Sequence, residues 1–284
     1  MQIGLSTPAV TAAPGSCSAW EADAVVEDLV GIAVAADAAG LDYLTCSEHI
    51  AVPVADEAGR GLTYWDPLST LAFLAARTHR IRLATAVVVL GYHHPLEIAK
   101  RYGTLDRLSG GRLILGVGVG SLSAEFDLLG APFDGRGERA DDMIAAVRAS
   151  LSRTRPSYSG EFYRYDGFAV QPCAVQARVP IWVGGRTLRS LRRSVRLADG
   201  WIPFGLSDIR IAEMLAAVDL PADFAVVLPT GRAIDPLGDP AGSQRRLRGL
   251  QALGATAITC TVAAESADHH CRQLAALRDI ADRL

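Results

Sequence analysis

The segment Thr104–Gly120 reads TLDRLSGGRLILGVGVG and passes from an amphipathic stretch into a short, nearly continuous apolar run. The amphipathic part belongs to a pattern that begins at Pro95, so we expect a helix over Pro95–Arg107. The apolar part predicts a strand over Leu113–Gly118 that is buried on both faces. A helix that leads into a buried strand indicates an α/β protein with a parallel sheet.

The same alternation continues on both sides of this segment. Eight short apolar or β-branched runs are spaced along the chain, and each is followed by a longer stretch with helical spacing. The predicted strands are Gln2–Ser6, Leu41–Cys46, Ile81–Val89, Leu113–Gly118, Ile181–Val183, Gly200–Pro203, Phe224–Leu228 and Thr256–Val262.

Eight helices are predicted between and after these strands. Asp66-Pro67 opens the second with a capping side chain followed by proline at the first helical position. Eight strand–helix pairs close naturally into a (β/α)8 TIM barrel, which is the fold class that we expect. The predicted helices are Glu21–Ala39, Pro67–Arg77, Pro95–Arg107, Gly137–Ser152, Leu188–Leu197, Asp208–Val218, Pro240–Leu253 and Ala267–Leu284.

Two kinds of insertion interrupt this rhythm. Residues 159–170 alternate in polarity around Asp166-Gly167, which predicts an inserted β-hairpin over about residues 156–172. Long connections over Ser47–Tyr64 and Ser121–Arg136 follow strands, so they lie at the C-terminal face, where barrel enzymes carry their active sites. No segment has the composition of a linker, and we expect one domain over residues 1–284.

Composition limits the class of protein. With 284 residues, 50% apolar and 21% charged, the chain has the material for a large core. A net charge of -3 and dispersed arginines offer no basic surface for nucleic acid. The sequence shows neither a secretory signal nor an apolar run of membrane-spanning length, so we expect no membrane association. Five scattered cysteines without a CxxC pair favour a cytoplasmic location: Cys17, Cys46, Cys173, Cys260 and Cys271.

The segment over residues 104–120 resembles the signature of the luciferase-like monooxygenase superfamily, whose members are flavin and deazaflavin enzymes built on a TIM barrel. The resemblance spans roughly residues 2–205, and the last third of the chain carries only the βα rhythm. It is closer to the coenzyme F-420-dependent subgroup, which implies a deazaflavin cofactor, with FMN as the alternative. Further pieces match in the same order: Ala35–Leu44 with Ser47-Glu48-His49, Asp66–Leu68 with Ile81–Val87, Pro180–Gly185, and Ala198–Trp201.

Glu48 and His49 follow the second predicted strand at its C-terminal end. A histidine can donate, accept or transfer a proton near neutral pH. The resemblance implies that both residues lie close to the reacting edge of the cofactor and that His49 handles a proton. A polar residue at this position can also simply cap the strand.

Two further segments have implied roles around the cofactor ring. The resemblance places Gly118 and Gly120 close to the ring, which glycine permits because it lacks a side chain. It also implies that Thr85-Ala86-Val87 forms a bulge under the ring, with a non-prolyl cis peptide between Ala86 and Val87. Glycines in a strand can instead allow bending or close packing. A dinucleotide-binding fold is a distant alternative, because its glycine pattern requires a glycine where Ser121 stands.

Gly184-Gly185-Arg186-Thr187 ends a predicted strand and opens a predicted helix. Backbone N–H groups and the helix dipole would meet an anion there, and Arg186 would add charge. The resemblance assigns this segment to the cofactor phosphate, and an ordinary helix start is the alternative.

Ser121 departs from the pattern of the subgroup. The sugar-phosphate dehydrogenases of the subgroup have a proton-donating glutamate there, and serine is a poor acid at neutral pH. Glu125 is a candidate substitute acid or a wall residue, and it would share a face with Ser121 if this segment were helical. We expect no metal site, because the adjacent pairs His93-His94 and His269-His270 lack a third ligand at metal spacing.

These observations predict an oxidoreductase that transfers a hydride between coenzyme F-420 and an unidentified small organic substrate. The alternatives are a reduced-FMN-dependent monooxygenase and a catalytically silent flavin-binding paralogue. Dimers are common in the superfamily, so a homodimer is a further expectation.

Overall fold

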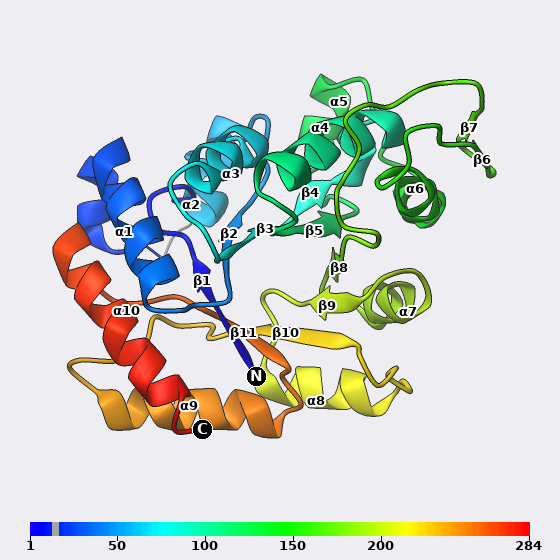
Figure 1. Ribbon diagram of the computed structural model, residues 1–284. Coiled ribbons are helices and arrows are strands. Elements are labelled where there is room, and N and C mark those ends of the chain that lie inside the picture. Colours follow the sequence, from blue (N-terminus) through cyan, green and yellow to red (C-terminus); the bar gives the residue numbers. More distant parts are fainter. Residues whose placement is uncertain (13–16) are drawn as a thin grey trace.

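A closed barrel of parallel strands forms the centre of the computed structural model, which describes residues 1–12 and 17–284 (Figure 1). Neighbouring strands follow chain order, and pairing between Gln2 and Ala257 closes the ring. The predicted TIM barrel is therefore confirmed. The strands around it are β1 (Gln2–Ser6), β2 (Tyr43–Cys46), β3 (Arg82–Thr85) with its continuation β4 (Val88–Val89), β5 (Leu113–Gly118), β8 (Ile181–Gly184), β9 (Gly200–Ile202), β10 (Ala225–Pro229) and β11 (Ala257–Cys260).

The main helices lie outside the strands, and all eight predicted helices are present (Figure 1). Short helices occupy the connections: η1 (Ala19–Asp23), η2 (Val54–Asp56), α2 (Glu57–Arg60), η3 (Leu90–Tyr92) and α5 (Ser123–Leu128). The main helices are α1 (Val26–Ala38), α3 (Pro67–Ala75), α4 (Pro95–Leu108), α6 (Arg136–Ser150), α7 (Leu188–Leu197), α8 (Asp208–Ala216), α9 (Pro240–Ala252) and α10 (Ala267–Ala281).

The first helix begins later than predicted, at Val26 and not at Glu21. The Glu21 carboxylate accepts hydrogen bonds from the N–H groups of Ala9 and Ser18, so it fixes the N-terminal segment. Asp28 accepts from the N–H of Val25 at 3.0 Å and caps the helix one turn further on.

The predicted strand over Ile81–Val89 is interrupted by a bulge. Leu83 pairs with Leu113 and Val88 with Val117, so β3 and β4 advance by one residue more than β5 between these pairs. The extra residue falls where a cis peptide joins Ala86 to Val87. The prediction of a non-prolyl cis peptide at this bond is thus confirmed.

The inserted hairpin is present, but its turn is not at Asp166-Gly167. Strand β6 (Tyr158–Ser159) pairs antiparallel with β7 (Arg164–Tyr165), and the turn comprises the four residues between them. The Asp142 carboxylate of α6 accepts from the N–H groups of Phe162 and Tyr163. This contact with α6 fixes the turn earlier in the sequence than the Asp-Gly pair predicts.

Side chains fill the barrel interior, so the barrel has no pore. The ring of Tyr43 lies against Gly4, and its hydroxyl bonds Thr259 Oγ1 at 2.9 Å. The ring of Trp182 packs edge-on against Tyr43 with 5.2 Å between centroids. This interior cluster also includes Ala84, Ile114, Val227 and Ala257, and a larger apolar layer separates the strands from the helices.

Gly116 of β5 faces the carbonyl oxygen of Thr85, and a Cβ at Gly116 would overlap that oxygen. We predict that Gly116→Ala lowers the free energy of unfolding by about 3 kcal/mol, because backbone must shift to make room. Gly249→Ala is the matched control, since Gly249 lies in α9 with open space around it. That variant should gain about 0.5–1 kcal/mol from helix propensity. Urea unfolding measures both, and equal effects would contradict the steric argument.

Candidate functional site

Glu125 of α5 lies at the centre of a hydrogen-bond network on the C-terminal face. Its side chain is 1% exposed and accepts four hydrogen bonds. Oε2 accepts from His49 Nδ1 at 2.7 Å and from the Tyr92 hydroxyl at 2.6 Å. Oε1 accepts from the N–H groups of Ile50 at 2.5 Å and Ala51 at 3.1 Å. The carboxylate therefore joins α5 to the loop after β2 and to η3.

These bonds decide the charge of Glu125. Burial alone raises the pKa of the carboxyl, but the hydrogen bonds from His49, Tyr92 and Ala51 outweigh burial and lower it below 4.5. The group is therefore ionised at neutral pH and is a poor proton donor. This geometry disfavours the sequence-based interpretation of Glu125 as a substitute acid and favours a positioning role.

His49 is the group that Glu125 positions. Because the carboxylate is ionised, its bond to Nδ1 requires the proton on that nitrogen. The other nitrogen, Nε2, has no hydrogen-bond partner among residues 1–12 and 17–284. The ring packs edge-on against Tyr64, with 4.5 Å between centroids, and its side chain is 17% exposed. The ring of His49 is thus held in place, with Nε2 left unpaired by these residues.

Glu48 has a different environment from its neighbour His49. It is buried, and its carboxylate accepts from the N–H of Val89 at 2.7 Å and from His93 Nε2 at 2.9 Å. Its own N–H donates to the carbonyl of Val87 at 3.3 Å. Burial lowers the pKa of His93, but the bond to Glu48 and its charge outweigh that effect and raise it. Glu48 therefore holds Val87 of the bulge and Val89 of the following strand β4.

Three glycines surround the bulge, and we call Gly116, Gly118 and Gly184 the glycine face. A Cβ at Gly118 would lie 2.7 Å from a methyl of Val87, and one at Gly184 would lie 2.8 Å from the other. The hydroxyl of Thr85 donates to the carbonyl of Gly116 at 2.7 Å.

The residues of the bulge differ in exposure. Thr85 is fully buried, whereas Ala86 and Val87 are half-buried, so only the last two offer surface to a ligand. Gly120 has a φ of +78°, and a Cβ there would lie 2.5 Å from the Phe126 ring. Its carbonyl accepts from Arg136 Nε at 3.1 Å, so the backbone at Gly120 packs closely against both α5 and α6.

The predicted phosphate segment begins α7. Gly185 has a φ of +153°, and a Cβ there would lie 2.5 Å from Ser190 Cβ. Thr187 Oγ1 accepts from the N–H of Ser190 at 3.1 Å, and Ser190 Oγ accepts from the N–H of Thr187 at 3.2 Å. The remaining first-turn N–H groups lack intrahelical partners by helix geometry, and Arg186 is exposed beside them.

Other arginines of α7 are held by α6. Arg189 bonds Glu138 at 2.5 Å, so its charge is directed toward α6. Arg193 is buried, and it bonds Asp141 and the carbonyl of Gly137.

Ser121 is separated from the network. It is exposed and precedes α5, which begins at Ser123, so it does not share a helical face with Glu125. The structure therefore brings His49 and Glu125 together, places Glu48 on the bulge, and leaves Ser121 outside.

Sequence reasoning missed Tyr92 and the Glu48–His93 pair. The only sequence signal for these contacts is that Tyr92 and His93 follow the third barrel strand, whose end lies at the C-terminal face.

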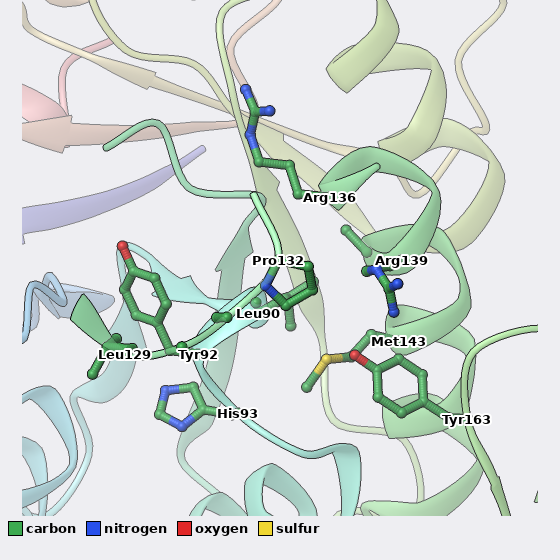
Figure 2. Close-up of a pocket in the computed structure, with 13 residues that line it drawn as sticks. Leu90, Tyr92, His93, Leu129, Pro132, Arg136, Arg139, Met143 and Tyr163 are labelled. Carbon is green, nitrogen blue, oxygen red and sulfur yellow. The ribbon is translucent and has the colours of Figure 1, made fainter. Parts of the chain in front are cut away.

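A cavity of about 250 Å³ adjoins this network. Figure 2 shows Tyr92 and His93 on one side of the cavity and Arg139, Met143 and Tyr163 on the other. Tyr92 and His93 bond the two buried carboxylates, so the cavity shares a wall with the site.

Residues 1–12 and 17–284 contain neither a candidate metal cluster nor a candidate membrane-spanning helix. No group of three or more potential metal ligands gathers in that part of the chain. None of its helices is long and apolar enough to span a membrane.

The sequence profile described as luciferase-like monooxygenase matches residues 1–229. The chain belongs to this family. Its members are oxidoreductases and monooxygenases. An F-420-dependent hydroxymycolic acid dehydrogenase of Mycobacterium tuberculosis is 32% identical over 206 residues, which are 71% of this chain and 55% of the dehydrogenase.

Solved structures share the fold. A monooxygenase from Streptomyces bottropensis has a TM-score of 0.74 with 23% identity and covers 98% of each chain. A coenzyme F-420-dependent tetrahydromethanopterin reductase from Methanopyrus kandleri has a TM-score of 0.72 with 14% identity, over 98% of this chain and 97% of the reductase. Because the sequence identities are below 25%, both structural similarities support the shared barrel fold and carry no information on cofactor or reaction.

The lowered pKa of Glu125 predicts a pH-dependent stability. A carboxyl with a lowered folded-state pKa contributes stability above its ordinary pKa of 4.5 and loses it as the pH falls through the folded value. The wild type should therefore exceed Glu125→Gln in free energy of unfolding at neutral pH, and the gap should close in acid. Glu213→Gln, which removes an exposed carboxylate paired with Arg210, should show hardly any gap. Denaturant unfolding of the wild type and both variants from neutral to acid pH tests the prediction. A difference in free energy of unfolding between the wild type and Glu125→Gln that stays constant with pH would contradict it.

Proposed function

We propose that this protein is a coenzyme F-420-dependent oxidoreductase that transfers a hydride between the deazaflavin and a small organic substrate. The observation that carries the proposal is His49, which Glu125 holds by Nδ1 and which keeps Nε2 open. His49 is one residue from Glu48, whose N–H bonds Val87 of the bulge. A proton acceptor and a surface for a flat ring therefore lie next to each other.

The residues present fit such a cofactor. Ala86 and Val87 offer half-buried apolar surface, and Gly118 and Gly184 beside them carry no side chain that would obstruct a flat ring. The start of α7 offers backbone N–H groups and the exposed Arg186 to a phosphate. The deazaflavin, when bound, supplies a ring carbon that accepts or donates a hydride.

The chain itself contributes orientation and proton handling. His49 Nε2 accepts the proton of a substrate hydroxyl during oxidation, or returns it in the reverse direction. Glu125 keeps the imidazole in the tautomer that this step requires. Glu48 fixes Val87 and so sets the height of the surface against which the ring would lie.

Family membership and the F-420-dependent dehydrogenase of Mycobacterium tuberculosis support this proposal. The family description also favours a second candidate, a monooxygenase that uses reduced FMN. The exposed Ser121 favours a third, a silent cofactor-binding paralogue, since the subgroup's proton donor is absent there. We further propose a cytoplasmic location, based on the scattered cysteines.

Parallel fluorescence titrations of the protein with coenzyme F-420 and with FMN test the cofactor. We expect F-420 to bind at least about tenfold more tightly, which corresponds to roughly 1.4 kcal/mol. Arg186→Gln should weaken F-420 binding about tenfold through the loss of a charge-assisted contact. Arg192→Gln, also exposed on α7, should leave it unchanged. A preference for FMN would favour the monooxygenase, and binding of neither cofactor would overturn the proposal.

His49→Gln tests the proton acceptor. We expect turnover to fall by at least about 100-fold while the Kd for the cofactor changes little, because the residue acts on the substrate proton. His94→Gln is the control, since His94 is exposed at the start of α4. Steady-state kinetics and the titration above separate the two effects. Unchanged turnover in His49→Gln would remove His49 from the mechanism, and cofactor binding without turnover on any substrate would favour the silent paralogue.

A further inference from the structure

A second and smaller cavity, of about 60 Å³, lies at the C-terminal ends of β1 and β11. Thr7 follows β1, Thr261 follows β11, and His270 reaches the cavity from α10. Thr11 and Glu21 complete its wall from the N-terminal segment. The cavity therefore lies at the seam where the first and last strands of the barrel meet, apart from the site at β2 and β5.

Polar atoms without partners gather at this seam. His270 is 1% exposed, and neither Nδ1 nor Nε2 has a hydrogen-bond partner in the described part of the chain. The hydroxyl of Thr7, which is 6% exposed, has none either. Trp20 Nε1 is also unpartnered, and its ring lies 6.0 Å from that of His270. These are four of the seven buried side-chain nitrogen and oxygen atoms that lack partners in residues 1–12 and 17–284. Buried polar atoms in folded proteins nearly always have a partner, so this concentration indicates a ligand.

The unpartnered side chains at the cavity favour a ligand that both donates and accepts hydrogen bonds. Burial, with a smaller contribution from His269, lowers the pKa of His270 to about 4, so the ring is uncharged at neutral pH. The two oxygens of Glu21 are already bonded to the N–H groups of Ala9 and Ser18. A neutral imidazole presents one donor and one acceptor, and the Thr7 hydroxyl presents both. His270 and Thr7 therefore require a ligand that can both donate and accept hydrogen bonds.

We propose that this cavity is a binding site for a small cluster of ordered water molecules held by His270 and Thr7. Water meets the donor and acceptor requirement, and the volume corresponds to about two molecules at roughly 30 Å³ each. A flavin or a typical organic substrate is far too large for this space.

The water cluster would connect the seam to the candidate active site. Thr11 lines the cavity, and its Oγ1 lies 2.7 Å from the Oγ of Ser47. Ser47 immediately precedes Glu48 and His49 in the loop after β2. Water between His270 and Thr11 thus extends a hydrogen-bonded connection from α10 to the start of this loop.

A matched pair of variants tests the site through stability. Thr7→Val removes the hydroxyl at nearly constant shape, and we expect the Tm to fall by about 2–4 °C because bound water loses a partner. Ser243→Ala removes a different buried and unpartnered hydroxyl, which lies in α9 away from the cavity, and should leave or raise the Tm. A rise in Tm for Thr7→Val, or no change, would show that the hydroxyl has no ligand and would overturn the proposal.

Magnetic relaxation dispersion of water on the full-length protein counts long-lived internal water molecules directly. We expect fewer of them in Thr7→Val and in His270→Leu than in the wild type, and the same number in Ser243→Ala as in the wild type. Equal numbers in all four proteins would overturn the proposal. Neither measurement uses a cofactor or turnover, so the result is independent of the proposed function.

Discussion

The contact between the bulge and the glycine face is the constraint on which the C-terminal face depends. The chain inserts one extra residue between β3 and β4, and Val87 must then lie against β5 and β8 at a distance that no Cβ allows. Gly118 and Gly184 provide that distance. Glu48 bonds the backbone of Val87 and Val89, and the N–H of Ala86 donates to the carbonyl of Cys46 on β2. The position of the half-buried apolar surface thus follows from close packing of four strands.

Buried carboxylates organise the loops above this contact. Taking a carboxylate out of water is unfavourable unless donors replace the lost hydration, and Glu125 receives donors on both of its oxygens. These donors come from the loop after β2 and from the short helix η3, so one side chain connects both segments to α5. The buried carboxylate of Glu48 likewise receives donors in place of water, from the N–H of Val89 and from His93 Nε2. The two adjacent residues therefore differ in role. Glu48 fixes the position of the bulge, whereas Nε2 of His49 has no hydrogen-bond partner among the described residues.

Elements that depend on local chemistry could be predicted from the sequence, and those that depend on distant contacts could not. The start of α3 follows from Asp66-Pro67, and Asp66 Oδ1 indeed accepts from the N–H of Ser69 at 2.7 Å. The hairpin turn was predicted wrongly because Asp142, in another element, determines it. The partners of Glu125 lie far away in the sequence: His49 and Ala51 are 76 and 74 residues away, and Tyr92 is 33 residues away. No local pattern indicates them.

The segment that carries the family resemblance specifies the fold more than the reaction. Within it, Asp106 is buried and accepts from the N–H groups of Val175 and Gln176, whereas Arg112 donates to the carbonyls of Ala75 and Ile81. These two residues secure the N-terminal end of β5, while its glycines make room for the bulge at the other end. The groups of the candidate site, His49, Tyr92 and Glu125, lie in the segments after β2, β4 and β5, outside that stretch. Family membership therefore accounts for the barrel, whereas under the proposed function the choice of substrate falls to loops that the signature does not constrain.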